Sequence, residues 1–362
     1  VIHINRLIKN YDQIKKKLSR DNLMIVVKAN AYGHGGIACA NALEKHGCKS
    51  FAVFSISEGI QLRDAGITSD ILIFSKFNNS YLELAIKHNL ILNISNIKDL
   101  MDLKEFSKKN KKSPRFHMKF DTGMTRLGLN IDEADEAFKI LSKNNELKYE
   151  GLYSHFATAD EGDLSFAYKQ VEKFKDILNK AELFGLQFKS IHFSNSGAVL
   201  NIDQKDFNLI RVGMLIYGAY PSNEVPKDID LQPVMEFKAP IVEVRRVDKG
   251  TQISYGGVYK TEKESNIGVV QCGFADGIPR PWYKNGFVGY KGKNYKIAGR
   301  ICMDQFMVNF EDDVPRQGDE VLIFGSNDYN SISMETIAEE IESTPYVIAT
   351  GINGRTEFFY QN

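Results

Sequence analysis

The chain carries no net charge, because 46 lysines and arginines balance 46 aspartates and glutamates over its 362 residues. Such a balance produces no electrostatic field that would attract a polyanion. Two short basic runs, at residues 15–17 and 108–112, lie in helical or loop patterns and are interpreted as solvated faces. We therefore exclude nucleic acid as a partner.

Cysteines, long apolar runs and leader sequences are scarce or absent. The four cysteines, at positions 39, 48, 272 and 302, show neither CxxC pairing nor metal-ligand spacing, and the seven histidines are scattered. We expect reduced thiols, a cytoplasmic location and no metal site. No run is long and apolar enough to span a bilayer, and no signal peptide is visible, so we expect no membrane partner. Because the sequence begins with Val1 and not with methionine, the removal of an N-terminal segment, which could include a signal, is left as an alternative.

The first 220 residues alternate between two kinds of segment. A hydrophobic content of 43% and a length of 362 residues predict a soluble protein of about two domains. Short apolar runs alternate with helix-length segments, which is typical of βα units. The eight runs are 23–28, 51–55, 71–75, 91–95, 116–121, 149–156, 191–195 and 210–217. Eight units favour a TIM barrel, with a doubly wound sheet as the alternative.

Beyond about residue 230 the pattern changes to short strands separated by Gly, Asp or Lys turns. The strand candidates are 239–247, 253–259, 268–272, 287–290, 295–298, 306–310 and 320–324, and one helix is expected over 333–342. We therefore predict an α/β chain with a TIM (β/α)8 barrel over 1–230 and a mainly β C-terminal domain over 231–362. The first few residues are allowed to join the β domain.

Several polar residues lie at the carboxyl ends of the predicted barrel strands, where barrel enzymes carry out their chemistry. They are Lys28, Lys119, Asp121, His155, Asn195 and Ser196. Taken singly, each has a simple explanation as a cap, a turn or a surface pair, and a lone lysine would most simply pair with a carboxylate. Their shared position instead predicts one site at the barrel mouth.

Two of these residues indicate a chemistry. A part-buried lysine that can lose its proton, such as Lys28, suits Schiff-base formation with a carbonyl compound or pyridoxal phosphate. Ser196 begins the helix-like segment 196–200, and a Ser-Gly start offers N–H groups and a hydroxyl to an anion such as phosphate. The alternative is that Ser196 only caps the N-terminus of this helix and binds no anion.

Six segments of the chain resemble the alanine racemase family, whose members depend on pyridoxal phosphate (PLP). The segments are VKANAYGHG (27–35), HMKFDTGMTRLG (117–128), SHFATAD (154–160), RVGM (211–214), ISYGG (253–257) and GRICMD (299–304). They occur in the family's order and span nearly the whole chain. The resemblance implies a PLP-binding barrel followed by a β domain, and an isomerase that interconverts L- and D-alanine for peptidoglycan.

By this resemblance, Lys28 holds PLP and then acts as a base on one face of the substrate, while Tyr255 acts on the opposite face. His155 is the neighbour that would help Tyr255 to lose its proton, and it bridges Tyr255 to Arg211. Arg211 stands against the pyridine nitrogen, where many other PLP enzymes place a carboxylate. The alternative is that Tyr255 has no catalytic role and is simply a residue of a hairpin turn before two glycines.

The resemblance also assigns the remaining contacts. The cofactor contacts come from Tyr32, Asn195, Ser196, Gly213, Met214 and Tyr346. The substrate contacts come from Arg126, Met303 and Lys119, and Lys119 matches a position that is often carbamylated. An entrance corridor includes Asp160, Phe274, Arg280 and Arg300, and Phe274 stands where many relatives have tyrosine.

Family members are homodimers in which the β domain of one chain completes the barrel site of the other, so Tyr255 and Met303 are expected to act in trans. Three alternatives keep the barrel: a broad-spectrum or serine racemase, a PLP-dependent decarboxylase, and a non-catalytic PLP-binding protein. Arg211, Tyr255 and the roughly 130 residues after the barrel favour racemisation over the last two.

Overall fold

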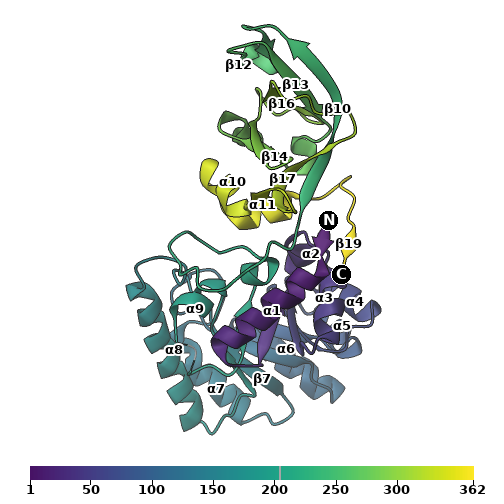
Figure 1. Cartoon of the computed structure of the whole chain (residues 1–362). Helices are drawn as coiled ribbons and strands as arrows, with labels where there is room; N and C mark the ends of the chain where they lie inside the picture. Colours follow the sequence, from purple (N-terminus) through teal and green to yellow (C-terminus); the bar gives the residue numbers. More distant parts are fainter. Residues whose placement is uncertain (204) are drawn as a thin grey trace.

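The computed structural model describes residues 1–203 and 205–362, which form a barrel and an elongated, mainly β region (Figure 1). The barrel strands are β2 (Leu23–Val26), β3 (Ser50–Val53), β4 (Asp70–Ile73), β5 (Ile91–Ile94), β6 (Arg115–Lys119), β7 (Lys148–Tyr153), β8 (Ser190–His192) and β9 (Ile210–Val212). Each strand overlaps one of the eight apolar runs, and the predicted barrel is confirmed.

The eight strands are parallel and follow the order β8-β7-β6-β5-β4-β3-β2-β9. The two edge strands approach each other through Asn208, whose N–H donates to the Ile191 carbonyl oxygen at 3.1 Å. The side-chain Oδ1 of Asn208 accepts the Ile191 N–H at 2.7 Å. β2 and β5 are buried at every residue, as expected for parallel strands covered on both faces.

Helices cover the outside of the barrel. They are α3 (Gly36–Lys45), α4 (Ile56–Asp64), α5 (Tyr81–Lys87), α6 (Ile97–Asn110), α7 (Ala134–Ser142), α8 (Ser165–Leu183) and α9 (Ser196–Asn201). β9 leads only into the 3-10 turn Met214–Tyr217, against which the N-terminal helix α1 (Ile4–Leu18) packs. The buried Asn10 amide fixes α1 by donating to the carbonyl oxygens of Ile216 at 3.1 Å and Gln232 at 2.8 Å.

The β domain is built on an antiparallel sheet of order β15-β14-β17-β10-β13-β16, and β18 pairs with β17. The strands are β10 (Phe237–Val247), β13 (Ser265–Val270), β14 (Phe287–Tyr290), β15 (Lys293–Lys296), β16 (Phe306–Glu311), β17 (Glu320–Ser326) and β18 (Ser331–Ile332). The helices α10 (Met334–Glu340) and α11 (Pro345–Gly351) lie at the end that faces the barrel (Figure 1).

The prediction for the β domain contained two errors. The run 253–259 is no continuous strand, because two-residue strands β11 (Gln252–Ile253) and β12 (Tyr259–Lys260) flank a 3-10 turn at Tyr255–Gly257. Gly256 and Gly257 adopt φ values of +74° and +54°, which breaks the extended backbone. The second error is a missed helix: the helix expected over 333–342 is present as α10, but α11, which begins with a proline at its first position, was not expected.

The two chain ends lie together between the barrel and the β domain (Figure 1). β1 (Ile2–His3) pairs in parallel with β19 (Tyr360–Gln361). The N-terminal ammonium donates to the Glu236 carbonyl oxygen at 2.7 Å, and the His3 ring lies 2.9 Å from the Glu236 carboxylate. The first residues therefore contact the segment that leads into β10.

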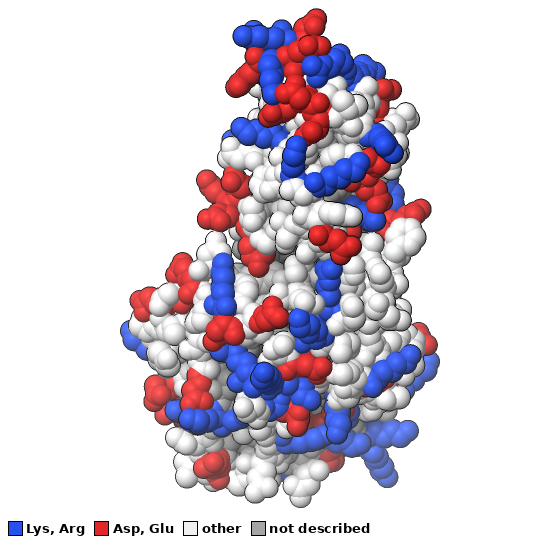
Figure 2. Space-filling view, in the orientation of Figure 1, with Lys and Arg blue, Asp and Glu red and all other residues white. Residues whose placement is uncertain are grey.

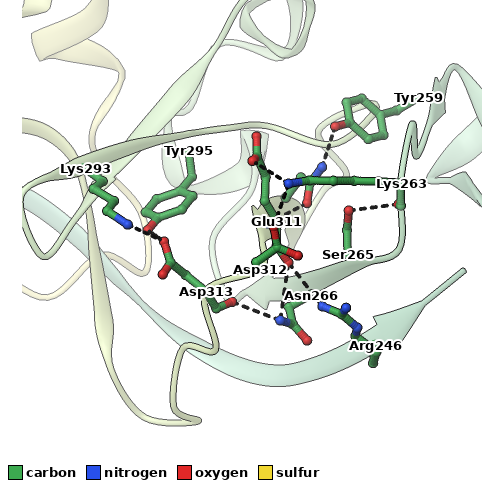
Figure 3. A network of polar contacts seen from close by, with 11 residues as sticks. Arg246, Tyr259, Lys263, Ser265, Asn266, Lys293, Tyr295, Glu311, Asp312 and Asp313 are labelled. Carbon is green, nitrogen blue, oxygen red and sulfur yellow. Dashed lines mark hydrogen bonds and ion pairs between the residues drawn. The ribbon is translucent and has the colours of Figure 1, made fainter. Parts of the chain in front are cut away.

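The far end of the β domain carries a set of charged residues that we call the distal ion-pair network (Figure 3). Its members are Glu264 and six residues labelled in Figure 3, namely Arg246, Lys263, Lys293, Glu311, Asp312 and Asp313. Lys263 lies 2.7 Å from Asp312, and Lys293 lies 2.8 Å from Asp313. Basic and acidic side chains are interspersed over the face shown in Figure 2. In the described ranges, no helix has the length and apolarity needed to cross a membrane.

Candidate active site

The carboxyl ends of the barrel strands surround a cavity of about 650 Å³. Most of the residues predicted for the barrel site line it together. They are Lys28, Tyr32, Lys119, Arg126, His155, Asp160, Asn195, Ser196, Arg211, Gly213 and Tyr346. Met214 lies beside them in the chain but is fully buried, so its side chain contributes to the core rather than to the cavity wall.

Lys28 enters the cavity from an unusual backbone. It begins the short turn α2 (Lys28–Tyr32), in which four consecutive non-glycine residues have positive φ: Ala29 at 50°, Asn30 at 54°, Ala31 at 57° and Tyr32 at 50°. A left-handed conformation costs roughly 1–2 kcal/mol for each L-residue, so the surrounding structure must hold this turn in place.

Three side chains hold the left-handed turn. The Glu58 carboxylate accepts the Ala29 N–H at 2.7 Å, and the side-chain oxygen Oδ1 of Asn30 accepts the Gly36 N–H at 2.7 Å. The Nδ1 of buried His34 lies 3.0 Å from the Ala31 carbonyl oxygen and 2.9 Å from that of Tyr32, so it carries the donated proton. Burial lowers the pKa of His34 to about 4, so this ring is neutral near pH 7.

Arg211 forms the floor of the cavity and is only 2% exposed. Its Nη2 donates to the carbonyl oxygens of Ser154 at 2.8 Å and Phe193 at 2.9 Å, and lies 3.1 Å from His155 Nδ1. Its Nη1 lies 2.7 Å from His192 Nδ1. Burial lowers the pKa of Arg211 to about 10, so the guanidinium keeps its charge at neutral pH.

A chain of neutral histidines extends from Arg211 into the barrel core. Because Arg211 can only donate, His192 Nδ1 accepts, and the His192 Nε2–H donates to His117 Nδ1 at 2.9 Å. Burial lowers the pKa of His117 to about 3 and that of His192 well below its ordinary value. Gly151 makes room for this chain, because a Cβ there would lie 2.4 Å from the His117 ring.

Both predicted lysines of the cavity have pKa values below the ordinary value of a lysine. Burial, with Arg126 second, lowers the pKa of Lys119 to about 8, and the same two causes lower the pKa of Lys28. Within residues 1–203 and 205–362, neither lysine forms an ion pair with a carboxylate. Asp121 is the carboxylate nearest to Lys119 in the sequence, but it accepts the N–H groups of Gly123 at 2.8 Å and Arg126 at 3.0 Å instead.

Hydroxyl and N–H groups gather on another side of the cavity. Ser196 Oγ accepts the Gly213 N–H at 3.1 Å, while the Asn195 side chain caps α9 through the Ala198 N–H at 3.0 Å. Tyr32 packs so closely here that a Cβ at Gly213 would lie 2.9 Å from its hydroxyl oxygen. The Tyr346 ring, which α11 contributes, is centred 5.7 Å from the Tyr32 ring.

This donor set fits a phosphorylated aldehyde. Lys28 supplies an amine that can condense with a carbonyl group, and Tyr32, Ser196 and the backbone at Gly213 surround a space suited to a phosphate. The cavity volume of about 650 Å³ lies within the usual range for small-ligand sites. The residues present therefore fit PLP.

Apart from Tyr346, the site residues predicted in the β domain do not line the barrel cavity of their own chain. Tyr255 and Met303 border a separate surface hollow of about 630 Å³, with side-chain exposures of 69% and 57%. Figure 1 places β12, next to Tyr255, at the end of the β domain away from the barrel. The corridor candidates Phe274, Arg280 and Arg300 also belong to the β domain, where the Phe274 N–H donates to the Cys302 carbonyl oxygen.

Several contributing residues were missed from the sequence. Glu58 could have been found, because Ser55 and Glu58 form an S-x-x-E capping box before an apolar helix. His34 and His117 lie inside the matched segments, yet nothing in their spacing indicated where the rings would point. The contact of His192 with Arg211 joins the closing strands β8 and β9, which only the folded barrel brings together.

A barrel with a part-neutral lysine, a buried arginine and phosphate-type donors at its mouth defines a lysine-dependent enzyme of amine and carbonyl chemistry. The family model for the alanine racemase N-terminal domain matches residues 2–221, and the model for the C-terminal domain matches residues 234–360. The chain therefore belongs to the alanine racemase family, and the resemblance inferred from its six segments is confirmed.

Individual relatives match over nearly the whole chain. Alanine racemase 2 of Caldanaerobacter subterraneus is 36% identical, over 99% of this chain and 93% of the relative. The alanine racemase structure from Clostridium difficile is 34% identical, with a TM-score of 0.92, over 99% of this chain and 94% of that one. The Bartonella henselae alanine racemase, solved with covalently bound pyridoxal phosphate, is 26% identical with a TM-score of 0.90, over 99% of this chain and 98% of that one.

Proposed function

We propose that the protein interconverts L-alanine and D-alanine with PLP bound in the barrel cavity. The observation that carries the proposal is Lys28, an amine of lowered pKa that faces a buried arginine and a cluster of phosphate-type donors. Membership of the alanine racemase family supports this reaction, and a relative that contains covalently bound pyridoxal phosphate supports the cofactor.

PLP, when bound, withdraws electrons and so stabilises the carbanion left when a proton leaves the substrate Cα. Lys28 would hold the cofactor's aldehyde end. Tyr32, Asn195, Ser196, Tyr346 and the backbone N–H groups of Gly213 and Met214 would hold the phosphate end. Arg211, already bound to four acceptors, would present a fixed cation to the ring.

Two bases on opposite faces of Cα account for racemisation most simply. Lys28, whose pKa burial lowers, takes or returns the proton on one face. Tyr255 would do the same on the other face, and His155, which lies 3.1 Å from Arg211 Nη2, would link Tyr255 to that arginine. The exposure of Tyr255 and Met303, neither of which lines the cavity of its own barrel, favours a homodimer in which each chain completes the partner's site.

Mixing two inactive variants tests the shared site. K28A loses one base and Y255F loses the other, so each homodimer should be inactive. If Tyr255 acts in trans, mixed dimers contain one site with both bases and should recover up to about half of the wild-type activity per mixed dimer. No recovery after verified subunit exchange would contradict the arrangement.

Lys119 and Arg126 are proposed to bind and orient the substrate carboxylate. The pKa of Lys119 near 8 leaves roughly a tenth of its amine neutral at pH 7. This neutral amine could react with carbon dioxide, with release of a proton, and the resulting carbamate would pair with Arg126. An acid-labile mass increment on Lys119, or rescue of K119A by small carboxylates, would support carbamylation. An unmodified and dispensable lysine would contradict it.

The remaining roles are likewise proposed from membership of the alanine racemase family. Asp160, Phe274, Arg280 and Arg300 are proposed to form the entrance corridor, with Asp160 already in the cavity wall. We propose residues 1–230 and 231–362 as the two domains. Provision of D-alanine for peptidoglycan, in the cytoplasm, is the proposed cellular role.

Chiral chromatography of the reaction with L-alanine in D₂O tests the function directly. We expect D-alanine that carries deuterium at Cα, without release of CO₂. Parallel reactions with L-serine and L-lysine measure the breadth of substrates. CO₂ release, or bound PLP without turnover, would overturn the proposal in favour of decarboxylation or cofactor binding alone.

A further inference from the structure

We propose that Glu58 is a positioning residue for Lys28, because its carboxylate ties the left-handed turn that carries Lys28 to the loop between β3 and α4. This inference rests on the role proposed for Lys28 above. Nothing in the six matched segments assigns a function to Glu58, which lies outside all of them.

The contacts of Glu58 exceed those of a capping residue. Its Oε2 accepts the N–H groups of Phe54 at 2.9 Å and Ser55 at 2.8 Å, and its own N–H donates to Ser55 Oγ, which completes the capping box of α4. Its other oxygen, Oε1, accepts the Ala29 N–H at 2.7 Å, which lies 29 residues away in the chain. One carboxylate therefore joins two neighbouring strand ends.

Glu58 can position Lys28 because the backbone N–H that it binds belongs to the next residue in the chain. Ala29 directly follows Lys28 and is the first residue of the left-handed turn. His34 and Asn30 hold the later part of this turn from within the same segment. Glu58, by contrast, approaches from another βα unit, so it sets the direction of the Lys28 backbone relative to the rest of the cavity.

The charge of Glu58 acts on the same lysine. The other titratable groups that line the cavity are those of Lys76, Lys119, Arg126, His155, Arg211, Tyr32, Tyr153, Tyr346 and the carboxylate of Asp160. Burial lowers the pKa of Lys28 most, Arg126 and Arg211 lower it further, and Glu58 opposes them. Loss of the carboxylate should therefore shift the deprotonation of Lys28 to lower pH.

Two substitutions separate position from charge. E58Q removes the charge and, since its amide nitrogen is a donor, sets an N–H against a backbone N–H. E58D keeps the charge but is one methylene shorter, so it cannot reach Ala29 while capping α4. E44Q is the matched control, because Glu44 also accepts two backbone N–H groups, from Thr68 at 2.9 Å and Ser69 at 2.6 Å, but at the opposite end of the barrel strands.

The experiment measures kcat and KM for L-alanine on the PLP-loaded full chain. It also measures the pH at which Lys28 is half-labelled by trinitrobenzenesulfonate in the cofactor-free full chain, located by peptide mass spectrometry. We expect kcat to fall about 10-fold or more in E58Q and E58D, with KM within about 3-fold of the wild type, because small misplacements of a reacting group cost large factors. The half-labelling pH should fall in E58Q and remain near the wild-type value in E58D.

E44Q should match the wild type in both measurements. Equal losses of kcat in E44Q and the Glu58 variants would overturn the proposal, as would unchanged kcat and labelling in both Glu58 variants. Failure of E58Q and E58D to fold, with E44Q folded, would assign Glu58 to stability alone and would also overturn it. If the wild type does not racemise alanine but Lys28 labelling shifts in E58Q, the proposed function fails while the positioning role stands.

Discussion

The barrel mouth and the distal ion-pair network use the same kinds of side chain in opposite ways. At the barrel mouth, Lys28, Lys119 and Arg211 are buried or nearly so, and burial lowers the pKa of each. In the network, a hydrogen bond to Asp312 raises the pKa of Lys263, and one to Glu264 raises that of Arg246. A basic residue becomes reactive where burial outweighs the nearby negative charges, and stays inert where a carboxylate pairs with it in water.

The two regions also differ in what they contribute to stability. Exposed ion pairs contribute little, because water and salt screen them and because two long side chains must be ordered. Arg211 is different, since it satisfies buried carbonyl oxygens of Ser154 and Phe193 that water cannot reach. The comparison therefore predicts large effects from changes at the barrel mouth and small ones from changes in the network.

The largest expected effect comes from K28A. Racemisation should fall by about 10³-fold or more, because both the covalent attachment and one base are lost. Thermal stability should be unchanged or slightly higher, since an unpaired, desolvated amine is removed. The rate is measured by chiral chromatography and stability by a thermal scan. The control K263A, in the network, should keep full activity.

R211Q should be the most destabilising of these substitutions. It leaves buried acceptors of Ser154, Phe193 and His192 without their donor, at a cost of about 3 kcal/mol in the free energy of unfolding. Urea denaturation measures the change. The matched R246Q variant, which removes an exposed ion pair with Glu264, should shift the thermal midpoint by less than about 2 °C. Equal effects would contradict the contrast drawn between the two regions.

R211E tests the chemical role of the same arginine. A permanently protonated guanidinium keeps a neighbouring ring nitrogen unprotonated, which limits electron withdrawal and so limits transamination. With glutamate at this position we expect more pyridoxamine phosphate per racemisation event, measured by chromatography of the released cofactor. An unchanged ratio would show that Arg211 does not control the fate of the proton.

The cavity lysines predict a pH dependence of stability. Lys119 has a pKa of about 8 in the folded chain and an ordinary value of 10.5 when unfolded. Between these values the unfolded chain holds a proton that the folded chain has released, so the free energy of unfolding rises with pH. K119M should remove about 1 kcal/mol or more of this rise, as measured by urea denaturation at pH 7.5 and 9.5 in buffer free of carbon dioxide, so that Lys119 carries no carbamate. K293M, in the network, should leave it intact.

The smallest expected effect concerns the network itself. D313A removes the carboxylate that Lys293 and Tyr295 share, yet racemisation should be unchanged and the thermal midpoint should move by no more than about 2 °C. The shift should shrink in 1 M salt, because exposed charges are screened. A loss of activity would indicate that the far end of the β domain is coupled to the barrel site.

Much of the fold could be predicted because its signals are local. Eight apolar runs marked the barrel strands, since a parallel strand buried on both faces needs a continuous run of such residues. The segment 253–259 failed as a strand prediction because two glycines with positive φ turn the chain inside an otherwise extended pattern. The helix α11 was missed, although it brings Tyr346 into the cavity.

The candidate site was also predictable only in part. The sequence by itself determined that Lys28, Lys119 and His155 would meet, because carboxyl ends of barrel strands must converge, whereas Arg211 was placed with them only by the family resemblance. Only the tertiary structure decided that Arg211 is held by His192 across the closing strands, that Glu58 holds the turn after Lys28, and that Tyr255 lies away from its own barrel. These outcomes depend on contacts between residues far apart in the chain, which no local pattern of side chains encodes.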